Sequence, residues 1–153
     1  MSVEQNDVRR LSERFAALYS AHDLDGLMAM YAEDAELQVV DQPEPLRGRT
    51  AIRQYLQAQF DAFPDVHVEL GTILVDGSSF ADEGVVTGTN TGPIAQPTGE
   101  PLPATGKALR LPFGEFVELA DGKVRRQRLY WDQLTALSQL GVLEMPQAAA
   151  AGA

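Results

Sequence analysis

Apolar residues recur with a helical spacing before Pro64, whereas long strand-like segments dominate the chain after it. Val8, Leu11 and Phe15 lie three or four positions apart, which is typical of the buried face of an amphipathic helix. The pattern predicts a first helix that ends near residue 21, a second over residues 24–31, a strand over residues 35–41 and a third helix from Thr50 to Pro64. Helices that are segregated from an antiparallel sheet predict an α+β fold.

The second half of the sequence predicts four strands, over residues 66–75, 80–91, 108–119 and 124–131, and a last helix over residues 133–140. A curved antiparallel sheet wrapped on three N-terminal helices would form a cone with an internal pocket. Residues 92–106 are rich in proline and glycine, and loops of this length often form the lid or rim of a site. We expect a single domain over residues 1–145 and a disordered tail over residues 146–153.

The composition argues against several kinds of site and partner. The chain has no cysteine, which excludes disulfides and thiolate chemistry, and its two histidines belong to no metal-binding or nucleotide-binding motif. We therefore expect no metal and no cofactor. A net charge of −10 disfavours nucleic acids and anionic membranes as partners. The sequence shows neither a long apolar span nor a secretory signal, so a cytoplasmic location is the default expectation.

Eight short motifs occur in order between residues 8 and 143: Asp23-Leu-Asp-Gly, Tyr31-Ala-Glu-Asp, Gly48-Arg-Thr-Ala-Ile, Thr87-Gly-Thr-Asn-Thr-Gly, Ala104-Thr-Gly-Lys, Ala120-Asp-Gly-Lys, Tyr130-Trp-Asp-Gln and Gln139-Leu-Gly. Together they resemble the SnoaL-like polyketide cyclase group of the nuclear transport factor 2-like superfamily. The resemblance implies the cone fold, a homodimer, and an apolar pocket for a small hydrophobic ligand that is often polycyclic or terpenoid. This fold hosts cyclases, isomerases, hydrolases, dehydratases and proteins without catalytic activity.

The resemblance also shows that the catalytic residues of the family are replaced here. It places the acid/base aspartate of SnoaL-like cyclases at Leu129 and their assisting histidine at Glu115. For ketosteroid isomerases, it places the tyrosine of the first helix at Phe15 and an acid of the fourth strand at Gly114. The carboxylate nearest to the position of the isomerase base is Asp41. Neither mechanism transfers intact, so the chemistry has to be argued from the residues present.

Glu115 is the one carboxylate in an otherwise apolar face of its predicted strand, which is formed by Leu109, Leu111, Phe113, Val117 and Leu119. A three-residue turn with Gly122 in the left-handed conformation would place Glu115 opposite Gln127 and Phe113 opposite Leu129. Burial would raise the pKa of this carboxyl and suit it to general acid or base catalysis. A salt bridge to Arg125, or a simple hydrogen bond to Gln127, would instead give Glu115 a structural role.

Asp41 is the second candidate catalytic residue. It follows Leu37 and Val39 on the same face of the predicted strand, where it would lie at the mouth of the pocket and assist Glu115. Alternatively, it begins the turn that contains Pro43, which is a common use of aspartate.

The candidate ligand-binding residues are Asn90, Gln127, Trp131, Leu129, Phe113, Phe15, Tyr19 and Tyr55. Asn90 and Gln127 would orient or polarise a ligand carbonyl, and Trp131 would stack on a flat ligand. The aromatic side chains are equally suited to packing in the core, where a buried tyrosine hydroxyl usually finds a hydrogen-bond partner.

These residues predict a cofactor-independent proton-transfer enzyme, a cyclase, isomerase or dehydratase, with Glu115 as its acid/base. Its substrate would be a small apolar, carbonyl-bearing molecule of polyketide or terpenoid type. The alternative is a non-catalytic binding or carrier protein for a small hydrophobic ligand, and Leu129 at the position of the family's aspartate favours it. A third possibility is a dimeric interaction module whose core is filled.

Overall fold

Four helices and six strands make up the part of the chain that the computed structural model describes, residues 3–144. The helices are α1 (Val3–Ser20), α2 (Leu24–Met30), α3 (Gly48–Ala62) and α4 (Gln133–Gln139). The strands are β1 (Tyr31–Val39), β2 (Leu46–Arg47), β3 (His67–Asp76), β4 (Ser79–Thr89), β5 (Ala108–Ala120) and β6 (Lys123–Trp131). The predicted tail over residues 146–153 lies outside the described residues.

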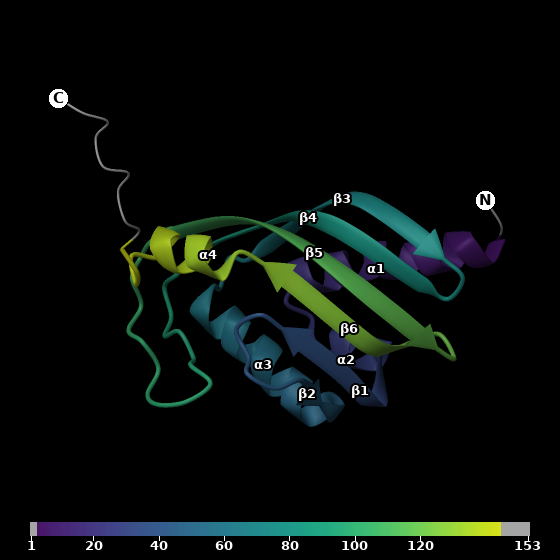
Figure 1. Cartoon of the computed structure of the whole chain (residues 1–153), viewed down its shortest axis with the longest axis horizontal. Coiled ribbons are helices and arrows are strands. Elements are labelled where there is room, and N and C mark those ends of the chain that lie inside the picture. The colour runs from purple at the N-terminus through teal and green to yellow at the C-terminus, as the bar shows by residue number, and fades with distance from the viewer. Residues whose placement is uncertain (1–2, 145–153) are drawn as a thin grey trace, which may run out of the picture.

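The strands form one curved sheet in the order β2-β1-β6-β5-β4-β3. Neighbouring strands are antiparallel except for β1 and β6, which run parallel. The sheet curves over α1, α2 and α3, and α4 covers the end at which β6 finishes (Figure 1). This arrangement confirms the predicted α+β fold. None of the described helices has both the length and the apolar character needed to cross a membrane.

The helix boundaries follow local capping chemistry. Asp23 accepts a hydrogen bond from the backbone N–H of Gly26 (2.9 Å) at the start of α2, and Asp132 accepts one from Thr135 (3.1 Å) at the start of α4. Such side chains satisfy the free N–H groups at a helix N-terminus. The predicted second helix is one residue too long, because Tyr31 is already the first residue of β1.

The first strand begins earlier and ends earlier than the sequence predicts. The pairing of β1 with β6 shifts register between Tyr31 and Glu36, and the consecutive residues Glu33 and Asp34 are both exposed. This irregularity breaks the alternation by which a strand is recognised. The strand ends at Val39, so Asp41 lies in the turn that follows it.

The turn between β5 and β6 has two residues rather than the predicted three. Asp121 and Gly122 both have positive φ angles, of 52° and 72°, as a type I′ hairpin turn requires. Ala120 pairs with Lys123, but further along Glu118 pairs with Arg126 and the register shifts. Arg125 is therefore an extra residue, and it forms a bulge in β6.

Because of the turn and this bulge, the candidate site residues pair differently from the prediction. Glu115 pairs with Leu129, and Phe113 pairs with Trp131. A two-residue turn alone would have moved β6 by one position and reversed its faces, but the bulge adds a second position. Gln127 therefore stays on the same face of the sheet as Glu115, diagonally across from it.

Asn90 ties the long loop over residues 92–106 to the end of α3. The side chain is fully buried and donates from Nδ2 to the carbonyls of Ala62 (3.1 Å) and Gly92 (2.9 Å). Its Oδ1 accepts from the backbone N–H (2.7 Å) and the hydroxyl (3.0 Å) of Thr105. One side chain thus holds both ends of the loop.

Substitution of Asn90 by alanine is expected to lower the free energy of unfolding by about 2–3 kcal/mol, because it leaves buried donors and acceptors without partners. Chemical denaturation measures this loss, and amide hydrogen exchange at Thr105 reports the release of the loop. Gln96→Ala is the matched control, since Gln96 bonds only the exposed carbonyl of Glu100, and we expect a change within about 0.5 kcal/mol. Equal losses in the two variants would contradict the role of Asn90.

Candidate functional site

An apolar cavity of about 380 Å³ lies between the sheet and the helices. This volume falls within the range of roughly 300–1,000 Å³ that is typical of small-molecule sites. Ile94 to Pro97 and Leu102 of the long loop form part of its wall, together with residues of α4. Two groups of polar side chains in the lining are joined by hydrogen bonds or strand pairing: Ser12, Tyr31, Asp82, Glu115 and Gln127 form one, and Asp41 and Tyr55 form the other. Gln59, Gln96 and Gln133 also line the cavity.

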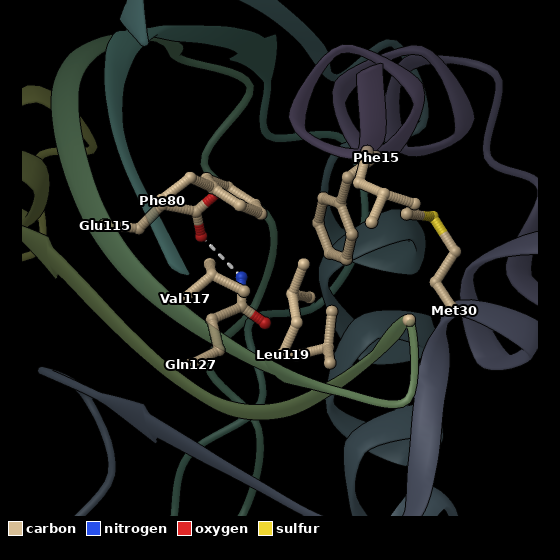
Figure 2. Close-up of a pocket in the computed structure, with 10 residues that line it drawn as sticks. Phe15, Met30, Phe80, Glu115, Val117, Leu119 and Gln127 are labelled. Atoms are coloured by element: carbon tan, nitrogen blue, oxygen red, sulfur yellow. Dashed lines mark hydrogen bonds between the residues drawn. The ribbon is translucent and has the colours of Figure 1, made fainter. Parts of the chain in front are cut away.

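Glu115 is positioned by the middle of β5 and points to the inner face of the sheet. Figure 2 shows its carboxyl group beside Phe80 and Val117, with a hydrogen bond to Gln127. Gln127 donates from Nε2 to Oε2 of Glu115 (2.5 Å), and its own Oε1 accepts from the hydroxyl of Tyr31 (2.5 Å). The amide orientation of Gln127 is therefore fixed from both ends.

The predicted alternative of a salt bridge between Glu115 and Arg125 is not formed. Arg125 occupies the bulge of β6 and is exposed, whereas Glu115 is only 6% exposed. The other alternative, a hydrogen bond from Gln127 to Glu115, is present. That bond positions the carboxyl without neutralising it.

Asp82 completes the group and was missed by the sequence analysis. It lies on β4 and pairs directly with Glu115 on β5. The hydroxyl of Ser12 on α1 donates to its Oδ2 (2.5 Å), and its Oδ1 is buried without a conventional donor. Asp82 shares the inner face of β4 with Phe80 and Val86, so extending the alternation back from Val86 could have found it.

Two buried carboxyls on paired strands cannot both be ionised at low cost. Burial, and after it the negative charge of Asp82, together raise the pKa of Glu115 to about 8, against the opposing effect of the hydrogen bond from Gln127. Burial also raises the pKa of Asp82, while Ser12 and Glu115 lower it by donating hydrogen bonds. At neutral pH we therefore expect the pair to hold one proton on Glu115, which as the acid can donate to Asp82.

The surroundings of Glu115 explain why burial dominates its pKa. A second, water-sized hollow of about 10 Å³ borders Glu115 and Gln127, and the side chains of Phe15, Met30 and Phe80 lie around it (Figure 2). Apart from Gln127, the side chains drawn there are apolar. Little solvent is available to stabilise a charge, so the protonated acid is favoured.

Asp41 lies at a different place in the cavity and not beside Glu115. The hydroxyl of Tyr55 on α3 lies 3.0 and 3.1 Å from the two carboxylate oxygens of Asp41 and donates to them. Burial raises the pKa of Asp41, and the bond from Tyr55 opposes this shift. Strand β6 separates Asp41 from Glu115, because Val39 pairs with β6 and β6 pairs with β5.

Most of the predicted ligand-binding residues line the cavity: Phe15, Tyr19, Tyr55, Phe113, Gln127, Leu129 and Trp131. Asn90 does not, because all of its side-chain hydrogen bonds hold the loop, and its prediction as a ligand-orienting residue is corrected here. Besides Asp82, neither the burial of Ser12 nor the contact of Tyr31 with Gln127 was predicted from the sequence. Ser12 lies among apolar positions of α1, where no pattern marks a single hydroxyl as buried.

Within residues 3–144, no group of three or more histidine, aspartate and glutamate side chains could hold a metal ion. The polar groups that reach the cavity are carboxyls, amides and hydroxyls. Of these groups, carboxyls can bind and release protons, whereas amides and hydroxyls donate and accept hydrogen bonds.

The shared proton makes stability depend on pH in a defined direction. The unfolded chain releases the proton of Glu115 near pH 4.5, whereas the native protein keeps it until about pH 8. Between these values folding takes up a proton, so the free energy of unfolding falls as pH rises. We expect Glu115→Gln to remove about 2–4 kcal/mol of this fall, measured by urea unfolding between pH 5 and pH 8.

Glu118→Gln is the matched control for this experiment, because Glu118 lies on the same strand but is exposed. Its unfolding should keep the pH dependence of the wild-type protein. A Glu115→Gln variant with the same pH dependence as the wild type would show that Glu115 titrates normally in the native protein.

Solved structures of low sequence identity share this fold. A proposed SnoaL-like polyketide cyclase from Jannaschia sp. CCS1 is 18% identical, with a TM-score of 0.82 over 94% of this chain and 98% of that chain. A proposed polyketide cyclase from Xanthomonas campestris pv. campestris is 24% identical, with a TM-score of 0.77 over 90% of this chain and 98% of that chain. A protein of ketosteroid isomerase-like fold from Catenulispora acidiphila, in complex with trimethylamine, is 18% identical, with a TM-score of 0.70 over 86% of this chain and 92% of that chain.

These structural similarities establish the fold and leave the substrate open. No curated protein matches the sequence. The SnoaL-like domain family matches residues 12–127, which is most of the chain and includes both carboxyls of the buried pair. The chain therefore belongs to the SnoaL-like domain family.

Proposed function

We propose that this protein is a cofactor-independent proton-transfer enzyme, a cyclase, isomerase or dehydratase. Its substrate would be a small apolar, carbonyl-bearing molecule of polyketide or terpenoid type. The observation that carries the proposal is the burial of Asp82 and Glu115 on paired positions of β4 and β5 in the wall of an apolar cavity, which raises the pKa of both carboxyls. A titratable pair with a raised pKa in a cleft is a common mark of an acid/base site.

The pair supplies both halves of an enolisation. Asp82 as the carboxylate removes a proton from the carbon next to the substrate carbonyl, and Glu115 as the acid gives its proton to the carbonyl oxygen. The product is a neutral enol, and the pair again holds one proton, now on Asp82. In each case the enol returns its O–H proton to the carboxylate of Glu115 and Asp82 gives up the proton that it took. In isomerisation Asp82 protonates another carbon of the enol, in cyclisation it protonates the oxygen of a second carbonyl that the enol carbon attacks, and in dehydration it protonates a hydroxyl that leaves as water.

The neighbouring residues keep this pair in place. Ser12 on α1 holds Asp82, and the relay from Tyr31 through Gln127 holds Glu115. The apolar cavity keeps water from the developing enolate, which strengthens each hydrogen bond made there. Leu129 pairs with Glu115, so the carboxyl lies one strand away from the position at which the resemblance places the family's aspartate.

A binding or carrier protein is the second candidate function. Two observations favour it: Leu129 supplies no acid, and Gln127 already bonds both Tyr31 and Glu115 without a ligand. A carrier would bind a hydrophobic ketone in the same cavity and release it unchanged. Proton exchange on the bound ligand distinguishes the two candidates.

The test is deuterium exchange at the carbon next to the carbonyl, followed by proton NMR in D₂O with a panel of polycyclic and terpenoid ketones. We expect the wild-type protein to accelerate exchange of at least one ketone. Glu115→Gln should lower kcat by about 10²–10⁴, because the amide cannot give a proton to the carbonyl oxygen. The wild-type kcat/KM should fall as pH rises through about 8, where Glu115 loses its proton.

The exposed Glu118 again provides the control, and Glu118→Gln should exchange like the wild type. Binding without exchange in the wild type would favour the carrier. Equal exchange by the wild type and Glu115→Gln would remove Glu115 from the mechanism.

The homodimer implied by the resemblance and the cytoplasmic location stay predictions. Phe116 (51% exposed) and Tyr130 (43% exposed) form a T-shaped aromatic pair outside the cavity. These are the side chains at which dimerisation would be sought.

A further inference from the structure

The cavity is lined by acidic side chains and by no basic ones among the described residues. Three carboxyl side chains, Asp41, Asp82 and Glu115, line it, but no lysine, arginine or histidine does so within residues 3–144. Asp82 and Glu115 lie on paired positions, where one protonated carboxyl can donate a hydrogen bond to the other. Asp41 has no second carboxyl beside it among the groups that shift its pKa. A substrate with a carboxylate or phosphate would meet no cation and up to two negative charges. The lining therefore favours a neutral or positively charged ligand.

Asp41 keeps room for a further hydrogen-bond donor. A carboxylate offers about four acceptor positions, and the one donor from a facing element is the hydroxyl of Tyr55. Gln42 and the backbone of Asp41 contribute weaker hydrogen bonds from its own turn, and the hydroxyl of Tyr19 is its other titratable neighbour. Tyr19 and Tyr55 both line the cavity, and the faces of aromatic rings attract cations.

The position of Asp41 relative to the carboxyl pair sets the shape of the ligand. Val39 and Glu115 both pair with Leu129, from opposite sides of β6, and Asp41 lies two residues beyond Val39. Two strand spacings across the sheet and two residues along it place the Cα atoms of Asp41 and Glu115 roughly 12 Å apart, and a ligand held between their side chains would span somewhat less, roughly 10 Å. Trp131 lies on β6 toward the end of the cavity at which Asp41 is found, and it also lines the cavity.

We propose that the substrate carries a basic amine, which Asp41 binds as an ammonium group while the carbonyl end of the substrate meets Asp82 and Glu115. The amine donates to the carboxylate of Asp41, and its alkyl groups pack against Tyr19, Tyr55 and Trp131. This inference rests on the proposed function and specifies its substrate class, an amino ketone in which roughly 10 Å separates the nitrogen from the carbonyl.

The test compares two ligands that differ in one atom. The first is an acetophenone with a dimethylaminopropyl chain in the para position, and the second has a CH group in place of the nitrogen. Isothermal titration calorimetry at neutral pH measures both. We expect the wild-type protein to bind the amine at least about tenfold more tightly than its uncharged counterpart.

Asp41→Asn keeps the size of the side chain and removes its charge, so the preference should shrink to below about threefold. Asp34→Asn removes the same charge from an exposed position of β1 and should keep the full preference. Circular dichroism checks that each variant is folded, and the comparison of the two ligands on the wild-type protein holds even where a variant unfolds.

Three results would overturn the proposal: equal binding of the two ligands, a preference that survives in Asp41→Asn, or no binding of the amine at millimolar concentration. Tight binding of the uncharged ketone with no preference for the amine would leave the proton-transfer function standing. Loss of exchange activity in Glu115→Gln tests that function separately, so the two proposals fail in distinguishable ways.

Discussion

The rest of the site depends on one constraint, the burial of two carboxyl groups on paired positions of neighbouring strands. Asp82 and Glu115 each lose most of their contact with water, and neither has a cation beside it among the described residues. Two negative charges on directly paired positions in an apolar wall are costly, so we expect the pair to keep one proton at neutral pH. The result is a group that both accepts and donates a proton, which is what enolisation of a carbonyl compound requires.

Irregular features of the sheet bring the supporting side chains to this pair. The bulge at Arg125 keeps Gln127 on the inner face, where it donates to Glu115. The register shift in β1 places Tyr31 at the start of the strand, fully buried, with its hydroxyl on Gln127. Bulges often occur next to active sites because they redirect one side chain without changing the fold. Here two of them complete a single hydrogen-bonded relay.

The fold could be predicted from the sequence because its signals are local and repeated. Helical spacing in α1 and α3, caps at Asp23 and Asp132, and alternation along β3 to β6 each indicate one element. The isolated acid in the apolar face of β5 correctly marked Glu115 as a buried residue. Asp82 was missed because it is a candidate only through its position opposite Glu115. That position depends on the register between β4 and β5, which the sequence of either strand alone does not determine. Asn90 was predicted to line the cavity because the alternation of side chains along a strand indicates the face on which a residue lies. It does not indicate the hydrogen-bond partners of that residue.

Direct observation of the shared proton tests the central claim. Carbon-13 NMR of side-chain carboxyls, with Glu115→Gln and Asp82→Asn used to assign the signals, follows each group through its titration. The account predicts a glutamate carboxyl that titrates near pH 8 and moves toward its ordinary pKa in Asp82→Asn, while burial still holds it above that value. Titration of Glu115 near pH 4.5 in the wild-type protein would contradict the shared proton and the mechanism built on it.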